Sequence, residues 1–144
     1  MAQQSLLWLP WALASAVFAA LTAIFGKIGV AGIPADLATL IRTLVVLASL
    51  VLIVSATDQW QAPGSIAGRT WLFLVLSGLA TGASWLCYFR ALKLGEAARV
   101  APVDKLSVVL VAVFGVVLLG ERLSGLNWLG VGLIAAGALL VALK

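Results

Sequence analysis

Asp104 and Lys105 stand side by side at the head of an apolar stretch, VAPVDKLSVVLVAVF, which runs from Val100 to Phe114. The stretch has the composition of a helix in a lipid bilayer. Charged groups are costly there, and they usually mark a ligand pathway, a proton relay or an internal ion pair. Arg42 interrupts a second apolar stretch in the same way. These three side chains are therefore the first candidates for chemistry in this chain.

The length of the uncharged sequence beside each charged residue indicates how deep that residue lies in the membrane. Leu106–Leu119 contains 14 residues and spans roughly 21 Å at about 1.5 Å per residue, whereas the hydrocarbon core is about 30 Å thick. Thr43–Ser55 contains 13 residues and spans roughly 20 Å by the same rise. Because neither run crosses the membrane alone, both helices must draw the preceding charges into it. The sequence thus predicts that Asp104, Lys105 and Arg42 lie within the membrane.

Lys27 and Arg90 differ, because each ends an uncharged run that is long enough to span the membrane by itself. Their long side chains can reach the interface. Lys27 still lies near the membrane, and with Arg42 and Lys105 it makes a set that is more basic than acidic. A site of this charge is expected to prefer a ligand with a negative group.

The region around Pro102 leaves alternatives open. Adjacent residues on a helix point about 100° apart, so Asp104 and Lys105 need not pair, and one can bond to another helix while the other faces a cavity. Pro102 removes a backbone donor and can break the helix beside the charges. Alternatively, it lies in the first helical turn, where proline is tolerated. The competing interpretation of all the membrane charges is structural, as contacts that hold helices together.

Several other residues are weaker candidates. Trp85 lies well inside an apolar run near Tyr88, so the two rings can line a cavity, although Trp85 can equally face lipid or the core. Glu121 follows a long apolar run, and a solvated interfacial carboxylate is its favoured interpretation. Asp36 and Asp58 have the positions of an ordinary helix-start acid and an ordinary loop acid.

The composition is that of an integral membrane protein. Of the 144 residues, 64% are hydrophobic and 10% are charged, against about 25% charged in soluble domains. The net charge of +4 is scattered without a basic cluster, so nucleic acid is not expected as a partner. The single Cys87 excludes a disulfide framework, and the absence of histidine removes the commonest metal ligand and general base. No metal, cofactor or enzymatic activity is expected.

Five apolar runs are long enough to cross a membrane. They are expected to be helices, because lipid offers the backbone no hydrogen-bond partner. Met1–Ser5 carries no basic residue and the first run exceeds the roughly 7–15 residues of a signal-peptide core, so this run is expected to remain as a span. The prediction is an all-α integral membrane protein of one domain, residues 1–144, with spans at residues 6–27, 35–55, 70–90, 98–120 and 126–143.

Basic residues near the ends of the spans predict the orientation. One side of the membrane would hold Lys27, Arg90, Lys93, Arg99 and Lys144, and the opposite side would hold Arg69 and Arg122. Lysine and arginine favour the cytoplasmic side. The amino terminus is therefore expected outside and the carboxyl terminus in the cytoplasm.

Six segments of the chain are characteristic of one family. The second half contains RALKLGEA, VAPVDKLSVV, LLGERLS and NWLGVGLIAAGALLV, and the first half contains FGKIGV and LATLIRT. Together they resemble the EamA repeat of the drug/metabolite transporter superfamily. The resemblance covers nearly the whole chain and is most specific in the second half.

This resemblance implies a five-helix unit that is one half of an inverted-repeat transporter fold. Most relatives carry two such units per chain in opposite orientations, whereas this chain has one. The resemblance therefore implies a homodimer, either antiparallel or parallel, in the lipid bilayer of the inner or plasma membrane.

On this basis we expect a secondary transporter that moves a small anionic or zwitterionic metabolite by alternating access. Arg42 and Lys105 would contact the substrate, and Asp104 would tune Lys105 or carry a coupling proton. Trp85 and Tyr88 would supply a stacking wall.

Two alternatives to this function are a multidrug or cation exporter of the small-multidrug type and a non-transporting membrane assembly module. Small-multidrug proteins carry a glutamate in the first helix, whereas Leu6–Gly26 contains no acid.

Overall fold

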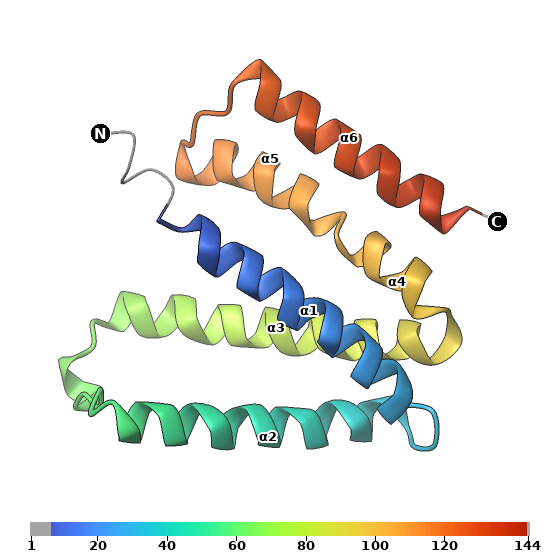
Figure 1. Ribbon diagram of the computed structural model, residues 1–144. Coiled ribbons are helices and arrows are strands. Elements are labelled where there is room, and N and C mark those ends of the chain that lie inside the picture. The colour runs from blue at the N-terminus through green and yellow to red at the C-terminus, as the bar shows by residue number, and fades with distance from the viewer. Residues whose placement is uncertain (1–6, 144) are drawn as a thin grey trace. The chain divides into compact units, whose positions relative to one another are not determined.

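The structure is a computed structural model that describes residues 7–143 (Figure 1). These residues form helices joined by turns and loops, with no β-strand among them, so the expected all-α fold class is confirmed. Leu6, which begins the first expected span, and Lys144 lie outside the described residues. The helices are α1 (Leu9–Gly29), α2 (Ala35–Ala56), the 3₁₀ helix η2 (Pro63–Ser65), α3 (Gly68–Leu94), α4 (Ala97–Asp104), α5 (Ser107–Leu119) and α6 (Gly125–Ala142).

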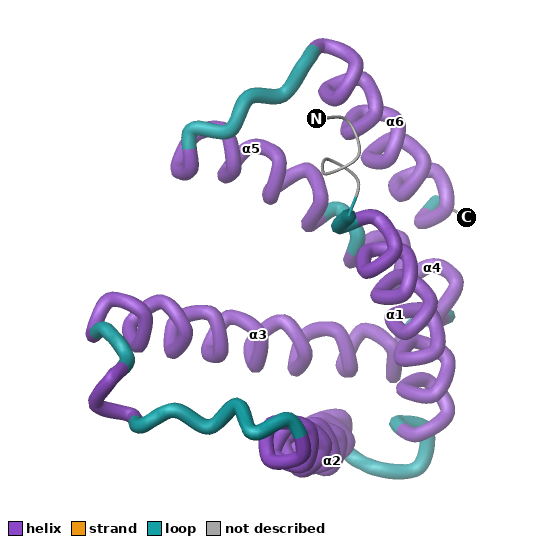
Figure 2. The backbone as a smooth tube through the Cα atoms, turned by 60° about the vertical axis from the view of Figure 1, so that its left-hand side comes forward, coloured by secondary structure: helices purple, strands orange, loops and turns teal. Residues whose placement is uncertain are grey.

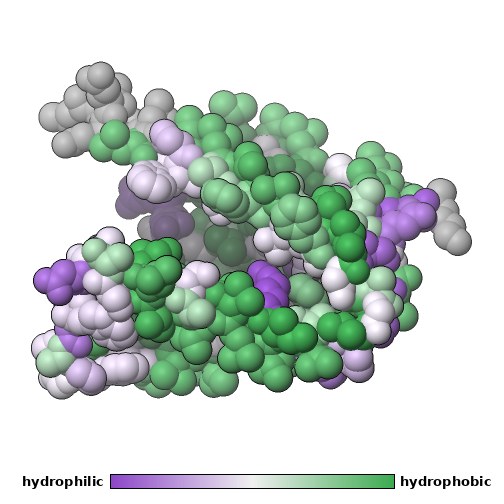
Figure 3. Space-filling view, turned by 60° about the horizontal axis from the view of Figure 1, so that its bottom comes forward, coloured by the Kyte–Doolittle hydropathy of each residue, from purple (hydrophilic) through white to green (hydrophobic). Residues whose placement is uncertain are grey.

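Five helical segments are long and apolar enough to cross a membrane, and α4 and α5 together form one of them. Few side chains of these segments are buried by the rest of the described chain. In no segment is more than 11% of the apolar stretch buried. Figure 3 shows one face, on which apolar side chains cover most of the surface. Such a surface is unfavourable in water and favourable in lipid. The protein is a multi-pass membrane protein.

The described residues divide into two compact units, and each has its own packing. Residues 25–93 contain the end of α1, all of α2 and nearly all of α3, and we call them the α2–α3 unit. Residues 7–24 and 94–143 contain the rest of α1 and α4 to α6, and we call them the α4–α6 unit.

The α2–α3 unit is packed at one end. In Figure 2, α2 is seen along its axis and α3 lies across the view. The two helices are therefore not parallel, and they diverge toward the loop that joins them. They meet where α2 begins and α3 ends, through contacts that join residue 33 to 93, 36 to 90 and 42 to 85. The buried residues gather at the same end: Val30, Ala35, Ala38, Thr39, Phe89 and Leu92.

Two tryptophans hold the loop between α2 and α3. The Nε1 of Trp60 donates to Ser55 Oγ at 3.1 Å, and the Nε1 of Trp71 donates to the Pro63 carbonyl at 3.3 Å. An indole has an apolar body and one polar N–H, so it suits the boundary between lipid and water. These contacts fix the loop at the far end of the hairpin.

Asp58 follows the end of α2 and has a strained backbone conformation. Its φ is 51°, and it is the non-glycine residue with a positive φ among residues 7–143. The N–H of Gln59 donates to Val54 O at 3.1 Å and the N–H of Asp58 donates to Ser55 O at 3.4 Å, which is the bonding of a Schellman cap. A side chain costs about 1–2 kcal/mol in this left-handed region, and a carboxylate here also faces the negative end of the helix dipole.

In the α4–α6 unit, the expected fourth span is two helices. α4 ends at Asp104, α5 begins at Ser107, and α6 packs against both. Across the break, the N–H groups of Lys105 and Leu106 donate to carbonyls three residues earlier, at 3.1 and 3.0 Å. This is the hydrogen bonding of a 3₁₀ turn, so the break tightens the chain next to the charged residues.

Pro102 lies inside α4, which begins at Ala97. The interpretation that placed Pro102 in the first turn is therefore wrong. A proline in a helix interior cannot donate a hydrogen bond, and its ring crowds the carbonyl four residues earlier. The helix continues through Pro102 and ends at Asp104. The next two residues, Lys105 and Leu106, separate it from α5.

We expect the substitution Asp58→Gly to raise the free energy of unfolding by about 1 kcal/mol, because glycine adopts the left-handed conformation without strain. Equilibrium unfolding in detergent micelles measures this change. Gln59→Gly is the matched control, since its φ is not positive, and it should lower stability. A loss of stability in Asp58→Gly would contradict the assignment of strain.

Candidate functional site

Arg42 stacks on the aromatic face of α3. Its guanidinium carbon lies 4.0 Å from the ring centroid of Trp85 and 5.4 Å from that of Phe89. Residues four apart share one face of a helix, so α3 offers the two rings side by side. The structure thus brings together Arg42 and Trp85, two of the residues that the sequence singled out.

The guanidinium of Arg42 keeps hydrogen-bonding capacity. Its Nη1 is buried, and no hydrogen-bond partner for it exists among residues 7–143. A ring attracts the face of a guanidinium but accepts little from N–H groups in its plane. A buried donor without an acceptor costs about 1–3 kcal/mol, so the Nη1 of Arg42 is a polar atom whose burial needs an explanation.

Tyr88 extends the aromatic face. Its ring meets Phe89 edge to face, with a centroid distance of 6.3 Å and an interplanar angle of 68°. The sequence predicted Trp85 and Tyr88 as a stacking wall, and in the structure the guanidinium of Arg42 lies over the Trp85 ring. Phe89 belongs to the same face, although its sequence position gave no reason to separate it from other apolar residues.

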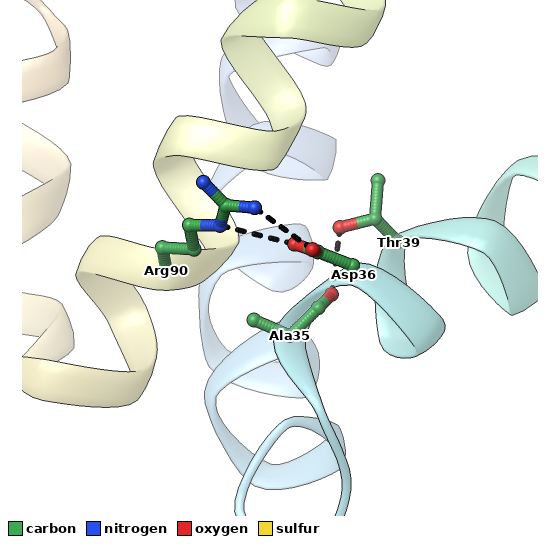
Figure 4. Close-up of polar contacts among 4 residues, drawn as sticks. All are labelled: Ala35, Asp36, Thr39 and Arg90. Carbon is green, nitrogen blue, oxygen red and sulfur yellow. Dashed lines mark hydrogen bonds and ion pairs between the residues drawn. The ribbon is translucent and has the colours of Figure 1, made fainter.

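Asp36 and Arg90 form a two-bond ion pair (Figure 4). Arg90 donates from Nε to Oδ1 of Asp36 at 3.0 Å and from Nη2 to Oδ2 at 2.8 Å. Asp36 does lie in the first turn of α2, as a helix-start acid should, yet its carboxylate also joins α2 to α3. The expected topology offered a signal for this pair, because it places the start of the second span and the end of the third on one side of the membrane.

Two lysines bond to backbone carbonyls at the same end of the unit. Lys27 Nζ donates to the Leu92 carbonyl at 2.6 Å, and Lys93 Nζ donates to the Ile33 carbonyl at 2.7 Å. The Leu92 carbonyl lies in the last turn of α3, where the helix itself supplies no partner. Lys27 thus joins the end of α1 to the end of α3.

In the α4–α6 unit, Asp104 and Lys105 pair with each other. Lys105 Nζ lies 3.3 Å from Asp104 Oδ2, and the two side chains are 54% and 36% exposed. The sequence had left open whether these neighbours bond to each other or to different partners. Their pairing neutralises both charges next to the break between α4 and α5.

Glu121 lies just after α5 and is exposed, in keeping with a carboxylate at the interface. Its side chain folds back over the helix, since a β-carbon built on Gly115 would stand 2.5 Å from Glu121 Oε2. Only a glycine at residue 115 leaves this space. Among residues 7–143, no three His, Cys, Asp or Glu side chains gather as a metal site would require.

These features define a class: a multi-pass helical membrane protein with ionisable groups inside its spans. The sequence profile of the EamA-like transporter family matches residues 6–143, and the chain belongs to that family. An "Uncharacterized transporter in cobO 3'region" of Sinorhizobium sp. is 70% identical over 135 residues, which are 94% of this chain and 96% of the relative. No solved structure matches the chain. The protein is accordingly a membrane transporter.

We expect charge exchange to expose the role of the Asp36–Arg90 pair. Arg90→Asp and Asp36→Arg should each lower the thermal unfolding temperature, because each places two like charges together. The double exchange should recover most of the loss. Recovery should be incomplete, since an arginine in the first turn of α2 opposes the helix dipole. Additive losses in the double variant, measured by thermal unfolding in detergent, would show that the pair does not join the helices.

Proposed function

We propose that this transporter moves a small anionic or zwitterionic metabolite by alternating access and acts as a homodimer. The observation that carries the proposal is the buried Nη1 of Arg42, which lies within a membrane span and lacks an acceptor among the described residues. A carboxylate matches a guanidinium in shape and charge and supplies strong hydrogen bonds.

The pairing of the other charges supports an anionic group on the substrate. Asp36 pairs with Arg90, and Asp104 pairs with Lys105. Arg42 forms no ion pair with an acid among residues 7–143, and its guanidinium lies over the rings of Trp85 and Phe89. An intramembrane cation without a counter-ion favours an anion and disfavours a lipophilic cation.

Trp85 contributes to the site by holding the guanidinium flat. A guanidinium is planar by itself, and its contact with a ring restricts the orientation of that plane, so less orientational freedom is lost when an anion binds. Tyr88 lies on the same helix face and would bound the site from the side.

Asp104 and Lys105 are proposed as the coupling pair. Transfer of a proton from the aqueous phase to the carboxylate of Asp104 would neutralise it and release Lys105 from the ion pair. Lys105 could then contact the anionic substrate. The break between α4 and α5 supports this role, because discontinuous helices offer backbone groups at transporter binding sites.

A single five-helix unit supports the proposal of a dimer in the inner or plasma membrane. In most of the family two units share a chain, so two copies of this chain would supply the same number of helices. The distribution of basic residues supports the proposal that the amino terminus lies outside.

The first test is uptake into proteoliposomes of labelled organic anions, zwitterions and lipophilic cations. Arg42→Ala should reduce anion uptake by about 10–100-fold, since a hydrogen bond to a charged group contributes about 1.5–3 kcal/mol. Anion uptake by Arg42→Lys should lie between that of the wild type and that of Arg42→Ala, because lysine keeps the positive charge but lacks the planar guanidinium. Arg69→Ala is the matched control, as Arg69 also lies over a ring, that of Phe73 at 5.8 Å, at the start of α3. Transport of lipophilic cations alone would overturn the proposal.

The second test concerns assembly and orientation. Native mass spectrometry from detergent should give a protein mass of about twice 14.9 kDa, and a monomer in active samples would contradict the dimer. In a Cys87→Ser background, Ser65→Cys should react with a membrane-impermeant thiol reagent from outside intact cells, whereas Gly32→Cys should react only after the membrane is opened. Reaction of both positions from outside would indicate an antiparallel dimer.

A further inference from the structure

Gly26 makes a close approach between α1 and α3. A β-carbon built on Gly26 would stand 3.3 Å from Cζ of Phe89 and 3.4 Å from Cδ1 of Leu92. A β-carbon built on Gly29, in the same last part of α1, would meet nothing within 4 Å. The absence of a side chain at Gly26 therefore allows close packing, whereas its absence at Gly29 has no such effect.

The packing at Gly26 holds the ring of Phe89. Phe89 is 3% exposed and Leu92 is fully buried. The bond from Lys27 Nζ to the Leu92 carbonyl fixes the adjoining residue of α1 on the same part of α3. A methyl group on residue 26 would need a few tenths of an ångström of space. Because the Lys27 bond holds α1 against α3, we infer that the Phe89 ring moves to provide it.

Another neighbour of the Phe89 ring is the guanidinium of Arg42, whose central carbon lies 5.4 Å from the ring centroid. Trp85 and Phe89 lie four residues apart and together set the place of that guanidinium on the face of α3. A movement of Phe89 away from residue 26 would therefore disturb the stacking of Arg42 on Trp85. The contacts form one chain from Gly26 through Phe89 to Arg42.

We propose that Gly26 and Phe89 are positioning residues for an anion-binding guanidinium at Arg42. The space above Gly26 lets the Phe89 ring sit where it keeps the guanidinium flat on Trp85, with Nη1 buried. The effect on transport rests on the function proposed above, whereas the effect on the geometry of Arg42 does not.

The geometry is tested by NMR of protein labelled with ¹⁵N-arginine in lipid nanodiscs, without any ligand. The Nε–Hε signal of Arg42 is assigned by its loss in Arg42→Lys and is shifted by the ring current of Trp85, which Trp85→Leu removes. Gly26→Ala should move this signal toward its position in Trp85→Leu. Gly29→Ala, the matched control, should leave it in place.

The double variant Gly26→Ala with Phe89→Leu separates positioning from general damage. If the methyl group acts through Phe89, it has no further effect once the ring is gone, so the double variant should match Phe89→Leu alone. An unchanged Arg42 signal in Gly26→Ala, or an equal shift by this substitution in both backgrounds, would overturn the proposal.

The uptake assay with the labelled organic anions adds the functional part. Gly26→Ala should raise the KM for anion uptake by about 5–10-fold with little change in the maximal rate, because a misplaced guanidinium weakens binding first. If the Arg42 signal moves as expected while no anion is transported by the wild type, the proposed function fails and the positioning of Arg42 by Gly26 stands. If anions are transported and Gly26→Ala has the KM of Gly29→Ala, the positioning role in transport fails.

Discussion

A cation within a membrane span needs an electron-rich partner, because lipid does not replace the water that the cation leaves. The α2–α3 unit supplies three kinds of partner. Arg90 meets the carboxylate of Asp36, and Lys27 bonds to a backbone carbonyl at the end of α3. Arg42 lies over the rings of Trp85 and Phe89. The first two contacts join the ends of three helices, and the third leaves the Nη1 of Arg42 without a hydrogen-bond partner among residues 7–143. The packing of this unit follows from this constraint, and the proposal that Arg42 binds substrate rests on it.

The α4–α6 unit meets the same requirement locally. Asp104 and Lys105 are neighbours in sequence and pair at 3.3 Å, so no second helix is needed to neutralise them. The pair lies where α4 ends and a 3₁₀ turn begins, downstream of a proline that weakens the helix. An ion pair on a turn can open without unpacking a helix interface. This is the physical reason for proposing the coupling step here and the substrate anchor at Arg42.

The sequence predicts that Arg42, Asp104 and Lys105 lie within the membrane, because the helical rise turns a count of uncharged residues into a length. In the structure all three belong to helical segments long and apolar enough to cross a membrane. Pro102 likewise indicated a weak point in the fourth span, although not the residue at which it breaks. The contact of Asp36 with Arg90 was missed, since each looked ordinary beside its own neighbours. Gly26 and Phe89 were missed for another reason. An apolar helix contains many glycines and phenylalanines, and these two are distinguished by their close approach, since a β-carbon built on Gly26 would stand 3.3 Å from Phe89 Cζ.

The sequence by itself determined the number of membrane-spanning segments, the membrane as their solvent and which charges belong to those segments. These properties depend on hydropathy and length along the chain, which are local quantities. Only the tertiary structure decided which partner each charge has, because residues 54 apart in sequence, such as Asp36 and Arg90, meet only when two helix ends come together. The proposal that Arg42 binds an anion rests on that pairing, since the acids that form ion pairs among residues 7–143 pair with other bases.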